Sequence, residues 1–333
     1  MTGLMIRRFL EAIPALLVVS VIMFGLLALG PNPLELLKQN PNITSEDVAR
    51  LTKQNGWDKP ITEQYVHWAG KFIKGDMGVS TVDQRPAWDK IRERLPLTLM
   101  ITGWSMIISL AIALPIGAYV AVHKYSKADY VATLTTFAMM ASPSFFVGLL
   151  LQLFALKLQD TTGSLLLYTA GTPACVGSDS GFLGTMFGCL ATPIEVFQRL
   201  ALPIFALSIL QIAGWSRYMR SELLGVLNQD YIRSAMAKGI PGKIVFMRHA
   251  MRNALLPLVT IVALDVAALF GGATITERVF GLPGMGNLLL DSLGQKDIAV
   301  VLAIVMIGAA LVLFMNMVAD VLYGVLDPRV RVG

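Results

Sequence analysis

Between two long apolar stretches the chain reads Asp230-Tyr-Ile-Arg-Ser-Ala-Met-Ala-Lys-Gly-Ile-Pro-Gly-Lys-Ile-Val-Phe-Met-Arg-His-Ala-Met-Arg-Asn-Ala-Leu-Leu-Pro257. The first part, from Asp230 to Lys238, predicts a helix of small and basic residues. Gly239 follows in the manner of a C-terminal cap, and Pro241 just beyond it prevents the helix from continuing. A second helix is expected from Lys243 to Leu256. The segment, named the cationic hairpin below, is predicted either to dock on a soluble partner or to lie on anionic lipid.

The composition of the chain indicates a polytopic membrane protein. Of its 333 residues, 55% are hydrophobic and only 15% are charged, whereas soluble domains usually carry about a quarter of charged residues. Apolar runs long enough to cross a hydrocarbon core of about 30 Å predict an all-α membrane protein with six transmembrane helices. The six expected spans are Phe9–Leu29, Leu97–Val122, Val131–Leu156, Leu200–Met219, Ala254–Thr276 and Ile298–Val325.

Proline lies within or at the start of several of these spans, and four of these prolines are considered as sites of a bend. Each proline removes a backbone hydrogen bond and therefore predicts a bend in its helix. Such bends suit either a bundle that opens a path or static packing between helices. The four residues are Pro115, Pro143, Pro203 and Pro257.

The distribution of Lys and Arg predicts that both termini are on the inside. Six spans place the two termini on the same side, and short inside loops carry an excess of basic residues. That side would hold seven basic residues from Arg217 to Arg252, besides those near the two termini. The net charge of +5 then reflects inside loops that face lipid and a protein partner. Nothing indicates nucleic acid, because the basic residues are not interleaved with aromatic residues on a soluble surface.

Three regions are expected along the chain. They are an N-terminal transmembrane helix (1–30), an external region (31–95) and a five-helix core (96–333). The external region predicts a helical layer made of Thr44–Asn55 and Ile61–Lys74. Its tryptophans, Trp57, Trp68 and Trp88, are expected either at the lipid headgroups or in an apolar cluster of the layer. The core includes a second external segment, 159–199, and the inside loop 220–257 that holds the cationic hairpin.

Two cysteines, Cys175 and Cys189, are the only ones in the chain and fall in the second external segment. Oxidising conditions outside permit a disulfide between them, which would contribute roughly 3 kcal/mol. Two buried free thiols are the alternative. No metal site is expected, because no histidine cluster lies near them.

The chain carries no motif of an enzyme. A G-x-x-x-x-G-K-[ST] phosphate loop is absent, since Gly242-Lys243 is followed by Ile and lacks the upstream glycine. The three histidines, His67, His123 and His249, lie in different segments. We therefore expect no ATP hydrolysis by this chain and no cofactor in it.

Asp265 is the clearest ionisable residue in the middle of an expected span, eleven residues after Ala254. A carboxylate at that depth costs roughly 3 kcal/mol on insertion scales, so it should have a partner or line a wet cavity. It is expected either to line a translocation path or to bond a Ser, Thr or Asn on another helix. Glu11 and Asp320 lie nearer to the ends of their spans.

The cationic hairpin resembles the EAA loop of ABC importer permeases, in the version of the dipeptide, oligopeptide and nickel importer family. Three further pieces are similar to the permease B type of that family, and together they touch both ends and the middle of the chain. They are Arg7-Arg8-Phe-Leu with Ile13-Pro14, then Glu277-Arg-Val-Phe-Gly-Leu-Pro-Gly-Met-Gly-Asn-Leu-Leu, and the closing Leu326-Asp-Pro-Arg329.

This resemblance implies the type I ABC importer permease fold and a non-catalytic subunit of the bacterial inner membrane. Such a subunit forms half of a translocation path for di- or oligopeptides. The implied partners are a homologous second permease, two ABC ATPase subunits that bind ATP and Mg²⁺, an extracytoplasmic substrate-binding protein and membrane lipid. The residues implied in ATPase coupling are Arg233, Ser234, Ala235, Lys238, Gly239, Arg248 and Arg252.

The sequence departs from the family pattern at three places. Arg233 and Ser234 stand where the family has its Glu and first Ala, whereas Ala235 and Gly239 match. The subgroup often lacks this Glu, so the coupling role is retained. The Gly-Asp-Pro after the first span is Gly30-Pro31-Asn32-Pro33 here, and segment 159–199 is longer than expected, which implies an unusual receptor contact.

The sequence leaves other cargoes of the importer and other classes of membrane protein as alternatives. The same machinery would import nickel chelates, oligosaccharides or haem, and the sequence does not choose among them because selectivity rests largely with the receptor. An ion-coupled secondary carrier is disfavoured by the shortage of charges in mid-membrane. A membrane scaffold or sensor would need no ATPase partner.

Overall fold

The structure is a computed structural model that describes residues 2–29, 44–56, 58–176, 189 and 191–326. These residues form helices, and their only β-pairing is an isolated antiparallel bridge between Val79 and Pro86. The expected all-α fold is therefore confirmed. Residues 30–33, Trp57 and residues 327–329 lie outside the described part of the chain.

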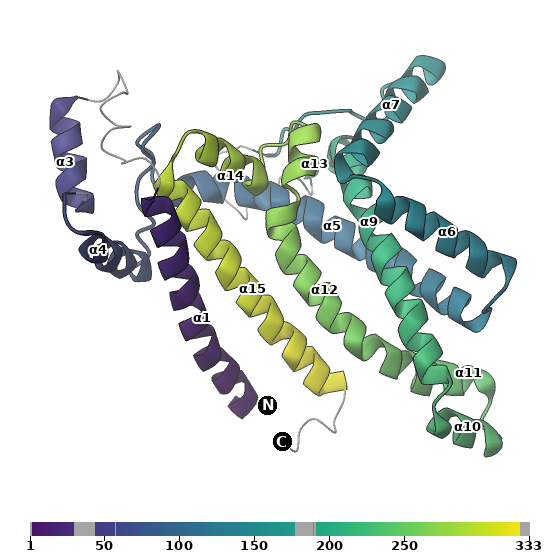
Figure 1. The fold of residues 1–333 in the computed structure, drawn as a ribbon. Helices are drawn as coiled ribbons and strands as arrows, with labels where there is room; N and C mark the ends of the chain where they lie inside the picture. Colours follow the sequence, from purple (N-terminus) through teal and green to yellow (C-terminus); the bar gives the residue numbers. More distant parts are fainter. Residues whose placement is uncertain (1, 30–43, 57, 177–188, 190, 327–333) are drawn as a thin grey trace.

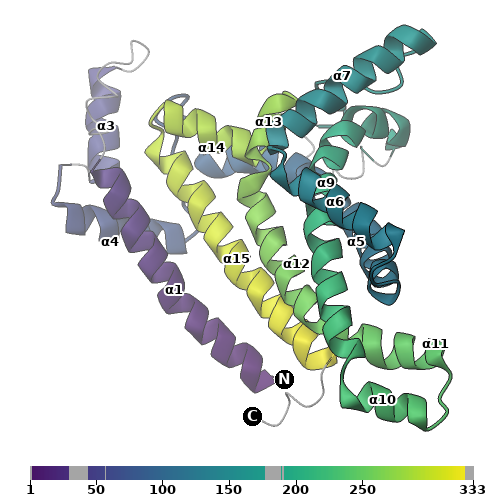
Figure 2. The same ribbon diagram turned by 45° about the vertical axis from the view of Figure 1, so that its right-hand side comes forward.

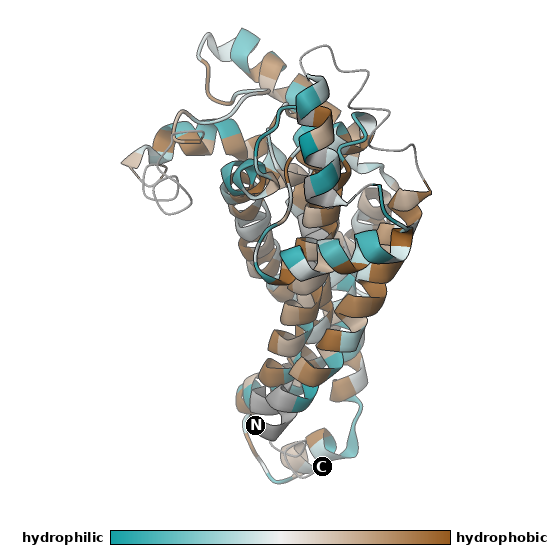
Figure 3. Ribbon diagram, turned by 90° about the vertical axis from the view of Figure 1, so that its left-hand side faces the viewer, coloured by the Kyte–Doolittle hydropathy of each residue, from teal (hydrophilic) through white to brown (hydrophobic). Residues whose placement is uncertain are grey.

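Four described helices are long and apolar enough to cross a membrane. They are α1 (Thr2–Ala28), α5 (Ala87–Val122), α9 (Pro193–Leu227) and α15 (Ile298–Leu326). A fifth span results if α6 (Lys127–Ala141) and α7 (Ser144–Thr162) are one bent pair. α12 (Arg252–Gly272) falls on the expected span Ala254–Thr276 and packs against α9 and α15 (Figure 1). Hydrophobic residues dominate these long helices (Figure 3).

The third expected span, Val131–Leu156, is not one helix. α6 and α7 meet at an angle of 104°. Pro143 lacks an N–H and disfavours helical geometry at the residue before it, and Ser142 is accordingly extended with a ψ of 127°. The prolines in α5, α9 and α12 lie inside continuous helices. Among the four prolines singled out above, the one in the third span therefore breaks its helix.

α5 and α9 form a closely packed helix pair. Small residues recur on α5 every four positions, a spacing that lets helix backbones approach closely in a membrane. These residues are Ser105, Ser109, Ala113 and Gly117. A Cβ added at Gly117 would lie 2.5 Å from the carbonyl oxygen of Ser216 on α9. Ser208 Oγ of α9 also donates a hydrogen bond to the Ser105 carbonyl at 3.2 Å.

α1 lies against α15 at the edge of the bundle (Figure 2). Arg8 Nε lies 2.9 Å from Asp320 Oδ2 on α15, and Arg7 Nε lies 2.9 Å from Glu11 Oε1. The two acidic residues near the ends of their spans, Glu11 and Asp320, are therefore both ion-paired.

Short helices lie beside α1 and at the end of the bundle away from the start of α1 (Figure 1). They are α3 (Ser45–Asn55), α4 (Ile61–Ile73), α13 (Thr274–Val279) and α14 (Met285–Gly294). Trp68 of α4 lies with its ring centroid 5.5 Å from both Phe24 of α1 and Phe72. Trp68 therefore belongs to an apolar cluster, which includes the first span as well as the layer.

Candidate functional site

The cationic hairpin consists of two helical limbs joined by a glycine turn. The first limb is α10 (Asp230–Ala237), and the N–H groups of Lys238 and Gly239 donate to the Ser234 and Met236 carbonyls. Gly239 has a φ of +76°, the left-handed conformation that glycine adopts without a steric penalty. The turn lies where the sequence predicts it, at the same end of the molecule as the start of α1 (Figures 1 and 2).

The returning limb differs from the expected α-helix. After the short α11 (Gly242–Ile244), residues Val245–Met251 form a π-helix, η1, which continues directly into α12. A π-turn closes its hydrogen bonds over five residues instead of four and is frequent at functional sites. The residue types give no signal for this change. The limb and α12 nevertheless form one uninterrupted helical rod.

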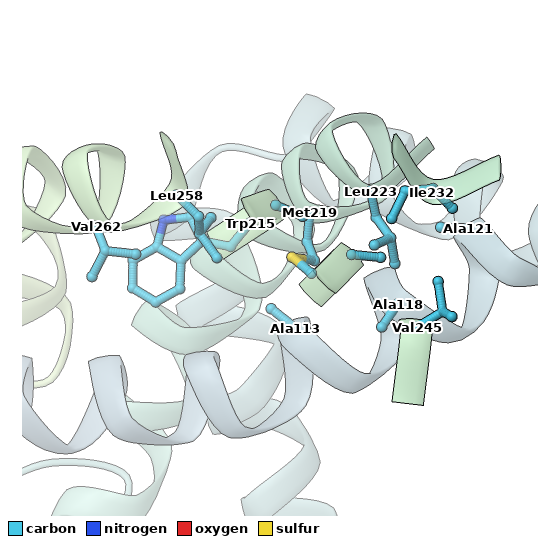
Figure 4. Close-up of a cluster of buried hydrophobic side chains, with 12 residues drawn as sticks. Ala113, Ala118, Ala121, Trp215, Met219, Leu223, Ile232, Val245, Leu258 and Val262 are labelled. Carbon is cyan, nitrogen blue, oxygen red and sulfur yellow. The ribbon is translucent and has the colours of Figure 1, made fainter. Parts of the chain in front are cut away.

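Three buried residues attach the cationic hairpin to the transmembrane helices. Ile232 of α10, with Val245 and Ala250 of η1, has no exposed surface. All three belong to one hydrophobic cluster with Met219 and Leu223 of α9, and Figure 4 shows this cluster running from the bundle into the hairpin. Close-packed interiors transmit strain instead of absorbing it. The hairpin therefore shares one packed core with α9 and α12.

The opposite surface of the cationic hairpin is exposed and basic. Asp230 is the only acidic residue of the segment 230–257, so this surface attracts an anionic partner or an anionic membrane. Of the residues implied in coupling, Ala235 packs half-buried against the cluster. The exposed ones are Arg233, Ser234, Lys238, Gly239, Arg248 and Arg252.

A hydrogen bond joins the two limbs of the cationic hairpin near its base. Asn253 Nδ2, at the start of α12, donates to Tyr231 Oη of α10 at 2.7 Å. The sequence gives no signal for this pair, because the two residues are 22 positions apart. The bond keeps α10 alongside the returning limb.

An ion pair braces α9 close to the hairpin. Arg220 Nε and Nη2 donate to the two carboxylate oxygens of Asp129, at 2.8 and 2.7 Å. The N–H of Tyr125 donates to the same carboxylate at 2.9 Å. The hydrogen bonds from Arg220 outweigh burial and hold the pKa of Asp129 below its ordinary value.

This ion pair was missed in the sequence. Ser126-Lys-Ala-Asp129 has the spacing of a capping box, and the N–H of Asp129 indeed donates to Ser126 Oγ at 3.2 Å. That spacing is a signal for the start of α6. Nothing in the sequence indicates the partner, Arg220, which lies 91 positions away.

Asp265 forms a contact between α9 and α12. Trp215 Nε1 donates to Asp265 Oδ2 at 2.6 Å, so the partner is an indole and not the expected Ser, Thr or Asn. Trp215 is itself buried within the cluster of Figure 4. This hydrogen bond gives one of the two carboxylate oxygens a partner. That Asp265 lines the translocation path stays a prediction.

Glu277 is a buried carboxylate at the opposite end of the bundle. Its oxygens accept hydrogen bonds from Thr98 Oγ1 at 2.7 Å and from the Asn287 N–H at 2.9 Å. Burial raises the pKa of Glu277, although these hydrogen bonds oppose the increase. A side chain at Gly284 would clash with this carboxylate. The fold therefore requires a glycine at position 284.

Asp297, between α14 and α15, is a second buried carboxylate at that end. It accepts hydrogen bonds from Ser80 Oγ and from the Thr81 N–H. Lys90 Nζ lies 3.7 Å from Asp297 and 3.0 Å from Asp83. Burial disfavours the charged form of Asp83, but the hydrogen bonds from Lys90 and Ser80 outweigh it and lower the pKa of Asp83.

Cys175 and Cys189 are joined by a disulfide, with their Cα atoms 5.1 Å apart. Of the two alternatives for these cysteines, the structure contains the bridged one. No group of three or more His, Cys, Asp or Glu side chains in the described part of the chain is arranged to hold a metal ion.

Two family models match the chain. Residues 113–332 match the binding-protein-dependent transport system inner membrane component. Residues 1–102 match the N-terminal model of the membrane components of the same transport systems.

Similar proteins align over the whole length. The oligopeptide transport system permease protein AppB of Bacillus subtilis is 36% identical, over 99% of this chain and 100% of the relative. OppB of Mycobacterium tuberculosis, an oligopeptide transport system permease protein, is 32% identical over 100% of both chains. The dipeptide transport system permease protein DppB of Escherichia coli is 31% identical over 99% of both. The chain therefore belongs to the family of inner membrane components of binding-protein-dependent transport systems, the permease subunits of ABC importers.

Proposed function

We propose that this chain is the permease B subunit of a peptide importer and forms half of the translocation path for dipeptides or oligopeptides. The names of the relatives, which refer to oligopeptide and dipeptide transport, support this cargo. The observation that carries the coupling role is the attachment of the hairpin through Ile232, Val245 and Ala250. A pair of helices that only rested on lipid would need no such anchorage in the core.

The coupling helix is the part of the hairpin from Arg233 to Gly239. It seats in a groove of one ABC ATPase subunit, with Arg233, Ser234 and Lys238 at the contact and Ala235 packed behind them. Arg248 and Arg252 extend the basic surface along the returning limb. The two ATPase subunits bind ATP and Mg²⁺, whereas this chain holds no cofactor and contributes different contacts in two states.

The proposed topology has six spans with both termini in the cytoplasm. The spans are α1, α5, the bent pair α6–α7, α9, α12 and α15. The placement of α10 at the same end as the start of α1 supports this orientation (Figure 2). The external region 31–95, segment 159–199 and the helices α13 and α14 then face the substrate-binding protein.

Replacement of Gly239 tests the coupling role. Gly239→Val places a β-branched residue at a φ of +76°, which costs about 1–3 kcal/mol and distorts the turn. We expect peptide uptake to be lost and ATP hydrolysis to become independent of the loaded binding protein. Assembly with the sister permease and the ATPases should survive, as measured by co-purification.

Gly242→Val is the matched control for this experiment. Gly242 lies in the same turn, its φ is not positive, and an added Cβ meets nothing within 4 Å. Uptake by this variant should stay close to that of the wild type. Normal uptake by Gly239→Val would contradict the coupling role.

Two further measurements separate the alternatives. Purification from membranes should bring down two ATPase subunits and a sister permease; their absence would favour an ion-coupled carrier or a scaffold. The ligand carried by the purified binding protein should be a short peptide. A nickel chelate, an oligosaccharide or haem in its place would replace the proposed cargo while retaining the importer.

A further inference from the structure

A hollow of about 480 Å³ lies between α6 and α9. This volume is within the range of small-molecule sites. The hollow lies on the hairpin side of the α6–α7 bend. Its wall includes Phe137 and Met140 of α6 and Arg217, Tyr218, Arg220 and Ser221 of α9.

Arg217 lies two residues before the inner end of the expected span Leu200–Met219. It is ten residues before the end of the helix at Leu227, which is about 15 Å along the axis. It is also two residues after Trp215, which bonds Asp265 of α12. A long basic side chain near the end of a span reaches the membrane interface, where its charge stays accessible to water. The side of α6 and α9 that holds this hollow is therefore a wet or protein-covered surface.

The positive charge of Arg217 is not neutralised by its neighbours. Its Cζ lies 4.1 Å from the centroid of the Phe137 ring, and Nη1 lies 3.1 Å from Met140 Sδ. In the described part of the chain no carboxylate forms an ion pair with Arg217. The nearby Asp129 is engaged elsewhere, since it is ion-paired with Arg220.

The stacking on Phe137 prepares this guanidinium for an anion. The Arg217 Cζ lies over the Phe137 ring. Nη1 contacts Met140 Sδ, whereas Nε and Nη2 form no hydrogen bond within the described residues. Nε and Nη2 together match the geometry of a carboxylate, which a guanidinium binds with two parallel hydrogen bonds. Arg217 therefore has both the charge and the unpaired donors that a carboxylate requires.

Gln211 adds a second unpaired polar group on the same stripe of α9. It lies seven residues before Tyr218, and residues at that spacing share one face of a helix. Both polar atoms of its side chain are buried, and neither has a hydrogen-bond partner among the described residues. Such an amide costs about 1–3 kcal/mol when unsatisfied. Gln211 does not line the hollow, so a molecule bound there does not contact this amide.

We infer that this hollow is a binding site on the translocation path, in which Arg217 receives the carboxylate of the transported peptide. The inference rests on the proposed function. The phosphate of an anionic lipid offers Arg217 similar chemistry, so the test has to separate the two sources.

The test uses the complete importer, with its binding protein, in lipid vesicles. Uptake is compared for one peptide with a free C-terminal carboxylate and with a C-terminal amide. Arg217→Gln should slow uptake of the free peptide by roughly tenfold or more, the effect of losing one hydrogen bond to a charged group. It should leave uptake of the amide unchanged, so that the preference for the carboxylate disappears. Arg217→Lys should restore part of the preference.

Lys127→Gln is the matched control, because it removes one positive charge from α6 at an exposed position outside the hollow. It should keep the wild-type preference. ATP hydrolysis stimulated by the loaded binding protein should be normal in all these variants.

Three results would overturn the assignment of Arg217. One is a preference for the carboxylate that survives Arg217→Gln. The second is that Arg217→Gln slows uptake of both peptides equally in vesicles that contain phosphatidylglycerol and has no effect in vesicles of phosphatidylcholine alone. This pattern would identify an anionic lipid as the ligand of Arg217. The third is a lost preference in Lys127→Gln as well. A wild-type complex that imports neither peptide would instead contradict the proposed function.

Discussion

Asp129 shows what a single acidic residue contributes at the hairpin end of the bundle. It joins the start of α6 to Arg220 of α9, which lies seven residues before α9 ends. The carboxylate is nearly inaccessible, and the Arg220 side chain is 28% exposed. Removal of the carboxylate leaves a partly buried guanidinium without a counter-charge, which costs more than the intact pair contributes.

We expect Asp129→Asn to lower the thermal stability of the purified protein at neutral pH by about 1–3 kcal/mol, less than for a fully buried pair because Arg220 is partly exposed. The pKa of Asp129 is lowered in the folded protein. Its stabilisation is therefore complete above the ordinary aspartate pKa of about 3.9 and is lost as the pH falls through the lower folded value. Thermal unfolding followed by intrinsic fluorescence should show a gap to the wild type that is constant from neutral to mildly acidic pH and narrows below that.

Asp160→Asn, at an exposed position at the end of α7, serves as the control and should leave the unfolding temperature unchanged. A gap that widens towards acid would contradict the role of the ion pair.

At the scale of the element, the cationic hairpin combines a buried attachment with an exposed working surface. Ile232 is fully buried, whereas Met236, one turn later on α10, is 52% exposed. The attachment makes α10 an extension of the core formed by α9 and α12. Loosening of the attachment should therefore disorder the hairpin before it affects the spans.

We expect Ile232→Ala to leave a cavity that costs about 2–5 kcal/mol and to reduce peptide uptake. Amide hydrogen exchange, measured by mass spectrometry, should accelerate throughout α10 and η1 while α5 and the middle of α9 stay protected. Met236→Ala removes a similar volume from the exposed side and should change neither exchange nor stability. Equal acceleration in the spans, or no acceleration in α10, would contradict the local role of Ile232.

The existence of the long helices was predictable, but their ends were not. Apolar length located α5 and α9, yet both helices continue through charged turns beyond the apolar run, to Ala87 and to Leu227. The helix propensity of these residues permits such additional helical turns, and tertiary packing decides whether they form. The break at Pro143 had a sequence signal, whereas the π-helix η1 had none.

For the molecule as a whole, the two buried carboxylates away from the hairpin hold distant segments together. Asp297 and Ser80 are 217 positions apart and bond directly. Glu277 similarly joins α13 to Thr98 of α5, 179 positions away. These contacts anchor the segment that faces the proposed receptor to the ends of the spans.

We expect Asp297→Asn to release the segment around Ser80 and Lys90, because the loss of the buried charge weakens the hydrogen bonds that Asp297 accepts from Ser80 and Thr81, at a cost of about 1–3 kcal/mol. Limited proteolysis should cut this segment faster, and stimulation of the ATPases by the loaded binding protein should fall while their basal activity persists. Asp291→Asn removes a surface ion pair with Arg278, worth about 0–1 kcal/mol, and should have little effect. Unchanged cleavage of Asp297→Asn would contradict the anchoring role.

The candidate site was predictable from the sequence only in part. The position of the hairpin, its glycine turn and its basic residues follow from local patterns, and so does the need of Asp265 for a partner. The partners themselves were not predictable, since Trp215, Arg220 and Ser80 meet their acids across long stretches of chain. Arg217 was counted only as one of the basic residues of the inside, because its place in a hollow depends on how α6 crosses α9.

The shared core of the hairpin and the spans has a consequence for chimeric importers. Ile232 and Val245 pack in the same cluster as Ala113 of α5 and Leu258 of α12, so the loop is not an independent cassette. If residues 230–251 alone were transferred into another permease, their buried side chains would not fit the core of that protein. Exchange of α5, α9, the hairpin and α12 as one block would keep these contacts matched. A chimera designed to bind other ATPases should therefore have its boundaries at the ends of this block.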